Sequence, residues 1–408
     1  MPDTLILPGQ HPILSFAELL TLTGLSPDAI QTATPDGFIF AGTLTPAQFP
    51  RLGGTIKAGQ VVAELDTLDK ENVLLRIAAY LRTEPAEKLR FGLSFVGPNS
   101  RSWDPEEMAF LVKSAVEDKS IRYVLPKEHG QTSAAQILHQ KLLPPDGYDL
   151  TVFLTHDKAW LARTSHIQDI ESYRLRDEGR PFRIRSEGMM PLKLCQIMIN
   201  LATPNRTETR PTLLDPFCGS GTILQEALLA DYDVIGSDLS PDAVKHSEAN
   251  LAWFKKYMLK DDAAEWSLFT QDVRQIGRAL LPNSIDLIVS EGYLGELFTK
   301  PPTRELIAMQ NKKLAPLYLA AFREFHRILR PGGKIAITLP YYLQENISLA
   351  EQILDAVLTI GYTSSSLLPE GAARALGTDS LHRIRPRGTY IYARPDQLIG
   401  REILLLQK

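Results

Sequence analysis

One run constrains the fold more than any other: residues 213–222 read LLDPFCGSGT. The run predicts an apolar strand that ends at Asp215, then a glycine-rich loop, then a helix that begins with residues 223–229, ILQEALL. From about residue 190 onward, predicted strands alternate with helices of ten or more residues. This alternation is typical of βαβ units, whose parallel strands form a sheet with helices on both faces. The sequence therefore predicts an α/β fold for the carboxy-terminal part of the chain.

The glycine loop predicts a site for an amino-acid group. Gly219 and Gly221 can take positive φ, which lets the backbone approach a ligand closely. The N-terminus of the following helix attracts a carboxylate, and Asp215 can accept a hydrogen bond from an ammonium. S-adenosylmethionine carries both of these groups at its methionine end.

Two further acids are predicted at neighbouring strand ends. Asp238 ends the strand in YDVIGSD, about 20 residues after the glycine loop, where an acid suits ribose hydroxyls. Asp272 ends the third strand, where a side chain can meet the adenine amino group. No G-x-G-x-x-G occurs at this loop, which disfavours a dinucleotide. The predicted cofactor is S-adenosylmethionine, contacted by Asp215, Pro216, Phe217, Gly219, Gly221, Thr222, Asp238, Leu239, Asp272 and Val273.

Several segments resemble one family. DPFCGSGT is similar to the first motif of S-adenosylmethionine-dependent methyltransferases that modify exocyclic amines. Residues 173–181 and 188–193 resemble the segment before this motif in THUMP-containing tRNA guanine-N2 methyltransferases, and residues 393–396 and 400–403 resemble that family's ending. LSFAEL, RLGGTIKAG and SIRYVLP resemble its N-terminal and THUMP regions. The resemblance implies a seven-stranded Rossmann-like methyltransferase sheet, preceded by small α+β N-terminal and THUMP-like domains, with tRNA as the partner.

The chain length fits several domains. At roughly 150 residues per domain, 408 residues suggest two or three folding units. We predict an N-terminal α+β, ferredoxin-like domain over residues 1–66 and a THUMP-like RNA-binding domain over residues 67–165. A linker over residues 166–190 then leads to the methyltransferase domain, residues 191–408.

The fourth strand of the predicted sheet ends in an unusual catalytic loop. The family places Asp or Asn there, followed by Pro-Pro-Tyr, so that side-chain and backbone oxygens hold the amine and an aromatic ring stacks on the flipped base. This chain has Ser290-Glu291-Gly292-Tyr293, without either proline. Alignment on Tyr293 puts Ser290 in the acid's place, whereas alignment on the acid makes Glu291 the acceptor. We favour Glu291, with Tyr293 as the stacking plane, and expect Gly292 to loosen the loop.

Basic residues gather in two segments that could contact RNA. Guanidinium groups suit phosphate contacts and base stacking. Internal ion pairs, such as Arg176 with Asp177 or Arg180 with Glu187, are an equally physical interpretation of the first segment. The candidate RNA-binding residues are Arg174, Arg176, Arg180, Arg183, Arg185 and Lys193, with Arg383 and Arg385 in the second segment.

Composition narrows the function classes. A formal charge of −4 gives no global attraction to nucleic acid, so local patches must supply the affinity. Two cysteines cannot build a disulfide framework, which predicts a reduced, cytoplasmic protein. No apolar run approaches the ~18 residues of a membrane span, and the histidines show no metal-ligand spacing. An adenine-N6 methyltransferase and a non-catalytic RNA-binding protein remain the alternative functions.

Overall fold

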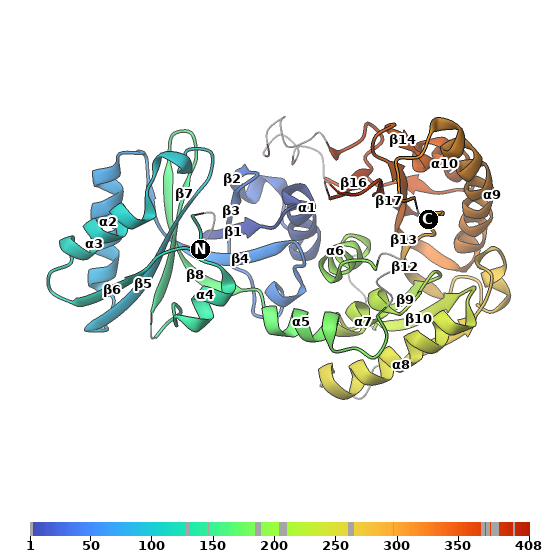
Figure 1. Cartoon of the computed structure of the whole chain (residues 1–408), viewed down its shortest axis with the longest axis horizontal. Helices are drawn as coiled ribbons and strands as arrows, with labels where there is room; N and C mark the ends of the chain where they lie inside the picture. The colour runs from blue at the N-terminus through green and yellow to red at the C-terminus, as the bar shows by residue number, and fades with distance from the viewer. Residues whose placement is uncertain are drawn as a thin grey trace. The chain divides into compact units, whose positions relative to one another are not determined.

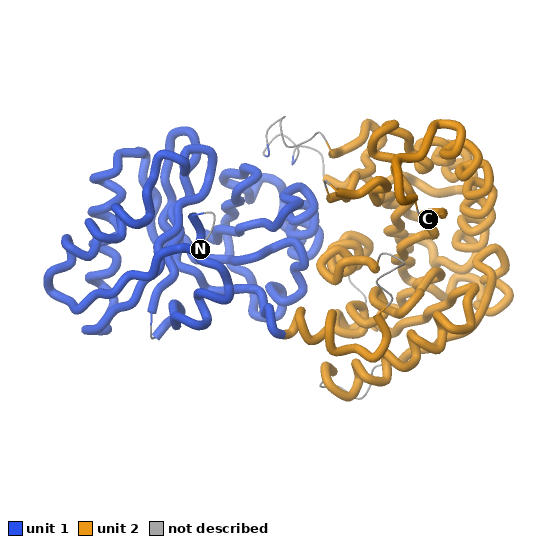
Figure 2. Tube along the Cα trace, in the orientation of Figure 1, with its two compact units in different colours: residues 1–171, 370–380 blue, residues 172–369, 381–408 orange. Residues whose placement is uncertain are grey.

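The computed structural model forms two compact units. It describes residues 3–127, 130–145, 147–183, 189–203, 210–259, 265–296, 298–368, 372, 376, 383–394 and 396–408. Unit 1 is Met1–Glu171 with Glu370–Ser380, and unit 2 is Ser172–Pro369 with Leu381–Lys408 (Figure 2).

Unit 1 is built on one eight-stranded sheet, in the order β2-β3-β1-β4-β8-β7-β5-β6. Its strands are β1 (Asp3–Pro8), β2 (Ile30–Thr34), β3 (Gly37–Ala41), β4 (Thr55–Leu65), β5 (Lys88–Val96), β6 (Ser120–Val124), β7 (Tyr148–Leu154) and β8 (Ala159–Ile167). Its helices are α1 (Pro12–Thr23), α2 (Lys70–Thr83), α3 (Pro105–Ala115) and α4 (Ala134–His139), with short 3-10 turns η1 (Pro27–Ala29), η2 (Phe49–Arg51) and η3 (Ser100–Ser102).

The sheet of unit 1 joins the two small domains expected from the sequence. β4, from the first expected domain, pairs antiparallel with β8, from the second, along eight residue pairs from Lys57–Ile167 to Leu65–Ala159. Apolar side chains of α2 and α3 pack on one face of β5, β7 and β8 around Phe91 and Leu150. The split at residue 66 thus falls within one continuous sheet and stays a prediction.

The first helix begins before a motif that is typical of helix starts. Ser15 and Glu18 match a capping box, but α1 begins three residues earlier, at Pro12, which suits the first helical position. Both residues are buried inside the helix. Glu18 accepts hydrogen bonds from the backbone N–H groups of Gly53 and Gly54, so the motif joins the helix to a turn.

Unit 2 contains the predicted α/β sheet, in the order β11-β10-β9-β12-β13-β17-β15. Strands β9 to β13 run parallel, whereas β17 is antiparallel to β13. The strands are β9 (Thr212–Asp215), β10 (Asp233–Asp238), β11 (Trp266–Thr270), β12 (Ile285–Glu291), β13 (Leu329–Tyr342), β15 (Thr363–Ser364) and β17 (Ile399–Gln407), with β14 (Ile347–Ser348) beside β13 and β16 (Tyr390–Tyr392) beside β17.

Helices cover both faces of this sheet, as the sequence predicts. Figure 1 shows α9 (Arg304–Ile328) and α10 (Leu349–Leu358) on one side, and α6 (Leu192–Ala202), α7 (Thr222–Leu229) and α8 (Pro241–Met258) on the other. The α9 and α10 layer buries Tyr318, Phe322 and Phe325 against the sheet. η5 (Val273–Arg278) follows β11, and α5 (Ile170–Glu178) leads into the unit.

Candidate functional site

The strand order of unit 2 places a crevice at the carboxyl ends of its central strands. From β9 the chain moves outward to β10 and β11, then crosses to β12 on the other side of β9. Open α/β sheets bind ligands where the strand order reverses in this way. Asp215, Asp238 and Glu291 are the last residues of β9, β10 and β12. Three of the four acids predicted at strand ends, Asp215, Asp238 and Glu291, therefore share one edge of the sheet.

A pocket opens at this edge. The glycine loop has the geometry that its sequence predicts, because Gly219 has φ of 52° and Gly221 has φ of 82°. A Cβ added at Gly219 would meet no protein atom within 4 Å, so the loop leaves open space beside its backbone. These features fit close approach by a ligand. The pocket is lined by Met189, Met190, Asp215, Phe217, Cys218, Gly219, Ser220, Thr222, Ile223 and Glu291.

Asp215 is buried at the base of the pocket. Burial raises the pKa of its carboxyl to about 7, while hydrogen bonds from Ser290 and from the Phe217 N–H lower it. Ser290 Oγ donates to Asp215 Oδ1 at 2.6 Å and is itself fully buried. Ser290, proposed from the sequence as a catalytic candidate, thus lies against the predicted ammonium acceptor.

Asp238 supports the glycine loop directly. Its Oδ2 accepts a hydrogen bond from the Gly219 N–H at 3.0 Å, and its Oδ1 accepts one from the Ser240 N–H at 2.9 Å. The adjacent Leu239, predicted as a cofactor contact, is 71% exposed. This geometry leaves each carboxylate oxygen a second lone pair for a ribose hydroxyl.

Asp272 has a local partner that the sequence analysis missed. Asp272 does not end the third strand as predicted, because β11 ends at Thr270; it is the N-cap of η5 instead. Its carboxylate forms a charged pair with Arg274, two residues later, at 2.5 Å. The hydrogen bond from Arg274 lowers the pKa of Asp272. The following Val273 is buried in the core and faces away from solvent.

Glu291 forms an ion pair at the pocket wall. Its Oε1 lies 2.5 Å from Nε of Arg401 on β17, and the two side chains are 20% and 6% exposed. Burial raises the pKa of Glu291, and the Arg401 guanidinium acts in the opposite direction. Sequence reasoning missed Arg401 as a partner because no local spacing relates two residues on separate strands.

The loop after Glu291 is held by helix α9. Tyr318 Oη donates to the Tyr293 carbonyl at 2.8 Å, and Gln310 Nε2 donates to the Leu294 carbonyl at 3.2 Å. The Gly292 N–H donates to Thr338 O on β13 at 3.2 Å. These contacts offset the loosening that glycine in place of proline predicts. The Tyr293 side chain is 51% exposed and thus accessible to a base.

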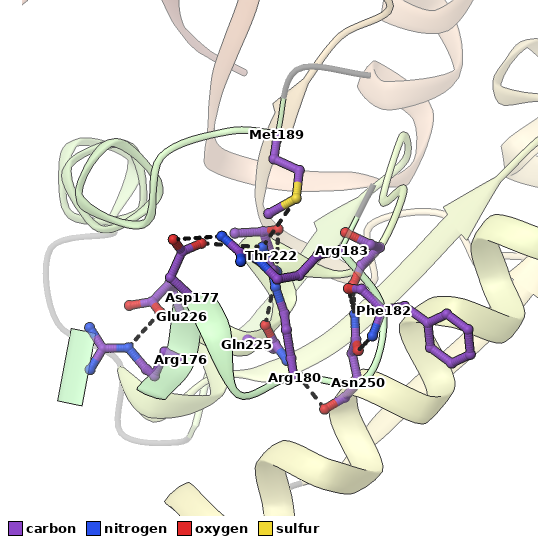
Figure 3. Close-up of polar contacts among 11 residues, drawn as sticks. Arg176, Asp177, Arg180, Phe182, Arg183, Met189, Thr222, Gln225, Glu226 and Asn250 are labelled. Carbon is purple, nitrogen blue, oxygen red and sulfur yellow. Dashed lines mark hydrogen bonds and ion pairs between the residues drawn. The ribbon is translucent and has the colours of Figure 1, made fainter. Parts of the chain in front are cut away.

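The first group of basic residues is largely internal (Figure 3). Arg176 Nε donates to Glu226 Oε1 at 2.8 Å, and Arg180 Nη1 donates to Thr222 Oγ1 at 2.7 Å. Arg183 pairs with Asp177 at 3.1 Å. Arg176 and Arg180 are 4% and 3% exposed, so their guanidinium groups are not available to phosphate in this structure. The internal-pair interpretation is thus favoured, although Glu226 is the partner of Arg176 rather than Asp177.

The remaining candidates for RNA contact differ in accessibility. Arg174 and Lys193 are exposed, and Lys193 Nζ lies 5.4 Å from the centre of the Tyr173 ring. Arg383 donates to the backbone carbonyls of Ile391 and Ala393. Arg385 forms an ion pair with Glu351 at 2.7 Å. Arg185 and Glu187 lie outside the described residues.

The geometry agrees with a comparison against family models. A model described as a methyltransferase domain matches residues 209–368, which contain the glycine loop, Asp215, Asp238 and Glu291. Unit 2 is an S-adenosylmethionine-dependent methyltransferase domain. A second model, described as a DNA methylase, matches residues 106–249. That match crosses from unit 1 into the methyltransferase unit and ends before Glu291.

Curated relatives agree with the resemblance stated from the motifs. The chain is 29% identical over 191 residues to a tRNA (guanine(10)-N2)-dimethyltransferase from Methanothermobacter thermautotrophicus, covering 47% of this chain and 50% of the relative. It is 27% identical over 153 residues to the protein of the same name from Pyrococcus abyssi, covering 37% and 39%. The chain thus spans half or less of the length of the curated relatives it matches. The predicted resemblance is confirmed as a distant relationship.

A solved structure shares the fold along the whole chain. The crystal structure of TrmN from Thermus thermophilus aligns over 100% of both chains with a TM-score of 0.54 and 17% identity. This likeness confirms the predicted fold class, in which a mixed α+β N-terminal part precedes a Rossmann-like methyltransferase sheet.

The described residues contain neither a membrane-spanning helix nor a cluster of metal ligands. Within those ranges every helix is too short or too polar to serve as a transmembrane span. No three histidine, cysteine, aspartate or glutamate side chains gather there as a metal site. Cys195 and Cys218 are buried free thiols.

Proposed function

We propose that the protein methylates the exocyclic N2 amine of a guanosine in tRNA. The observation that carries this proposal is the position of Glu291, whose carboxylate lines the same pocket as the cofactor acid Asp215. An exocyclic amine is a poor nucleophile because its lone pair is delocalised into the ring. A carboxylate that accepts one of its hydrogens favours the pyramidal, reactive form of the nitrogen.

Each residue of the site has a distinct part in this proposal. S-adenosylmethionine supplies an electrophilic methyl group. Asp215 holds its ammonium and Asp238 its ribose. The Asp272 carboxylate accepts a hydrogen bond from the adenine amine while it stays paired with Arg274. Glu291 accepts the amine hydrogen of the guanine, and the half-exposed Tyr293 ring stacks on the flipped base. Arg401 positions the Glu291 carboxylate.

Unit 1 carries a basic face that suits RNA. Lys88 and Arg90 are two residues apart on β5, so their side chains share a face, and Arg90 is opposite Arg122 on β6. The intervening Leu89 points into the core beneath α2 and α3, which puts the basic side chains on the other face. Arg90 donates to Gln140 O at the end of α4, beside the exposed Lys141. We call Lys88, Arg90, Arg122 and Lys141 the basic face.

The basic face supports RNA binding by charge. Among the described residues none of its four members is in an ion pair, unlike Arg176 and Arg180 of the methyltransferase unit. Counterion release makes such unpaired cations favourable for a phosphate backbone. We therefore propose unit 1 as the THUMP-like RNA-binding part, with Arg174, Lys193, Arg383 and Arg385 as further candidates and the cytoplasm as the location.

The test is methyl transfer to unmodified total tRNA with labelled S-adenosylmethionine, followed by nucleoside mass spectrometry. We expect N2-methylguanosine, and we expect Glu291→Ala to lower the single-turnover rate by roughly 10²–10⁴-fold while S-adenosylhomocysteine still binds. Glu117→Ala, at an exposed position in unit 1, is the matched control and should retain the rate. Full activity of Glu291→Ala would show that the catalytic loop is aligned wrongly.

A second candidate function follows from the DNA methylase model that matches residues 106–249. Adenine-N6 methylation uses the same cofactor motif and the same need for an amine acceptor. The same assay separates the two functions, because N6-methyladenosine in place of N2-methylguanosine would favour the second. Binding of cofactor and RNA without product would favour a non-catalytic RNA-binding protein.

A further inference from the structure

Charge balance in the pocket leaves one group of the cofactor without a counterion. Among the described residues that line the pocket there are two carboxylates, Asp215 and Glu291, and no lysine, arginine or histidine. Asp215 suits the ammonium of the methionine end. The carboxylate of the methionine end would therefore lie near two other carboxylates. Its burial is unfavourable unless a cation lies close by, behind the residues that line the pocket.

Arg180 stands behind that wall (Figure 3). Its side chain is fully buried and contacts two lining residues: Nη1 donates to Thr222 Oγ1 at 2.7 Å, and Nη2 lies 3.6 Å from Met189 Sδ. Nη1 is also 3.3 Å from Gln225 Oε1, a neutral acceptor. Two carboxylates act on its charge: Asp177, which is 3.8 Å away and 45% exposed, and Glu226, which is already paired with Arg176. Nε is buried and has no hydrogen-bond partner within the part of the chain that the structure describes. Burial of a guanidinium carries a desolvation penalty, which a close and buried carboxylate would offset. Arg180 has no such carboxylate of its own among the described residues, which is unfavourable for a purely structural group.

The direction of the Arg180–Thr222 hydrogen bond fixes what Thr222 can offer. A guanidinium has donors only, so Thr222 Oγ1 must be the acceptor. The single hydroxyl proton of Thr222 is then free to donate elsewhere, and the described residues record no acceptor for it. Because Thr222 lines the pocket, an anion there can take this proton in a hydrogen bond.

The start of α7 supports the same site. Thr222 is the first residue of this helix, and its N-cap, Gly221, provides no side-chain cap. The N–H groups of the first turn therefore lack a side-chain acceptor and are oriented toward the N-terminal end. Together with the Thr222 hydroxyl they suit a carboxylate.

We propose that Arg180, acting through the hydroxyl of Thr222, is the positioning residue that neutralises the carboxylate of bound S-adenosylmethionine. Segment 173–183 is then a wall of the cofactor site rather than an RNA contact. The inference rests on the cofactor alone and does not depend on which base is methylated.

Calorimetric titration with two ligands tests the proposal. S-adenosylhomocysteine carries the carboxylate, and its decarboxylated analogue keeps the amine and lacks the carboxylate. We expect the wild-type protein to prefer S-adenosylhomocysteine by roughly 10- to 100-fold. In Arg180→Met this preference should vanish, because the Kd for S-adenosylhomocysteine rises by that factor while the Kd for the analogue changes by less than about twofold.

Further variants keep the test decisive. Thr222→Val should lose the preference and Thr222→Ser should keep it, so the contact is still tested if Arg180→Met does not fold. Arg183→Met is the matched control, since Arg183 pairs with Asp177 and is not among the residues that contact Thr222. Equal weakening of both ligands in Arg180→Met and Thr222→Val would overturn the proposal in favour of a structural role. If the wild-type protein bound neither ligand, the assignment of S-adenosylmethionine as the cofactor would be wrong. If it bound both ligands as expected but methylated no tRNA, only the proposed RNA substrate would be wrong.

Discussion

Arg401 lies 2.5 Å from Glu291, and the pair joins the last residue of β12 to β17 at the wall of the pocket. Burial alone would favour the protonated form of Glu291, and the guanidinium favours the carboxylate. The pair therefore keeps an anionic hydrogen-bond acceptor at a buried position. The charge of the Glu291 carboxylate therefore depends on Arg401, a residue far along the chain.

Replacement of Arg401 by Met should shift the dependence of the methyl-transfer rate on pH to higher pH. Without the guanidinium the pKa of Glu291 rises further, so less carboxylate is present at pH 7. We expect a single-turnover rate about 10²-fold lower at pH 7, recovering as the pH increases. The rate of Arg401→Lys at pH 7 should lie between those of the wild-type protein and Arg401→Met. Arg330→Met, which breaks a separate pair with Asp286 on β12, should keep the wild-type dependence of rate on pH. A uniform loss at every pH would contradict the prediction.

Cofactor binding should depend on pH through Asp215. Its pKa of about 7 means that the carboxyl is neutral below that value and must lose a proton to pair with an ammonium. The Kd for S-adenosylhomocysteine should fall by up to about tenfold per pH unit as pH rises from 5.5 toward 7, and then level off once the Asp215 carboxyl is ionised. Titrations near pH 6 in buffers of different ionisation enthalpy should report proton release. Asp215→Asn should bind weakly with a flat profile, and a flat wild-type profile would refute the assignment.

Gly292 should not tolerate a side chain. A Cβ there would lie 2.3 Å from Tyr318 Oη and 2.9 Å from Thr338 O, so the loop or helix α9 must shift. We expect Gly292→Ala to lower the free energy of unfolding by about 1–3 kcal/mol and the turnover by about 10²-fold, with S-adenosylhomocysteine binding retained. Gly9→Ala, whose nearest contact would be 3.4 Å, is the control for thermal unfolding. Unchanged turnover in Gly292→Ala would mean that the loop position is not critical.

Local patterns predicted the acids of this site but not the residues that control them. Asp215 and Asp238 could be located because strand ends and glycine loops are visible over about ten residues. Arg401 and Arg180 act on residues that are 110 and 42 positions away, and no periodicity relates such pairs. For the segment that contains Arg176 and Arg180, RNA contact and internal ion pairs were equally consistent with the sequence, since the groups on α7 that contact these arginines lie far along the chain. The burial of Arg176 and Arg180, which no local sequence pattern shows, favours internal contacts over phosphate contacts for both residues.

Arg176 should matter for stability rather than for RNA. Its pair with Glu226 is buried on both sides, at 5% and 0% exposure, and Glu226 Oε2 has no hydrogen-bond partner among the described residues. Arg176→Met leaves a buried carboxylate without its cation, which costs about 3–5 kcal/mol of unfolding free energy. The double variant Arg176→Met/Glu226→Leu should recover much of that loss in denaturant titrations. Weaker tRNA binding without lower stability would instead support a phosphate contact.

The basic face of unit 1 should control tRNA affinity without affecting chemistry. Reversal of two cations, Lys88→Glu with Arg122→Glu, removes favourable phosphate contacts, so the KM for tRNA should rise and kcat should stay near the wild-type value. The slope of log affinity against log salt should shrink by about two. Lys70→Glu with Lys113→Glu, on α2 and α3 at the opposite face, reverses the same charge and is the matched control. Filter-binding across a salt series checks both variants, and equal losses in the two would show that net charge alone, and not this face, determines the affinity.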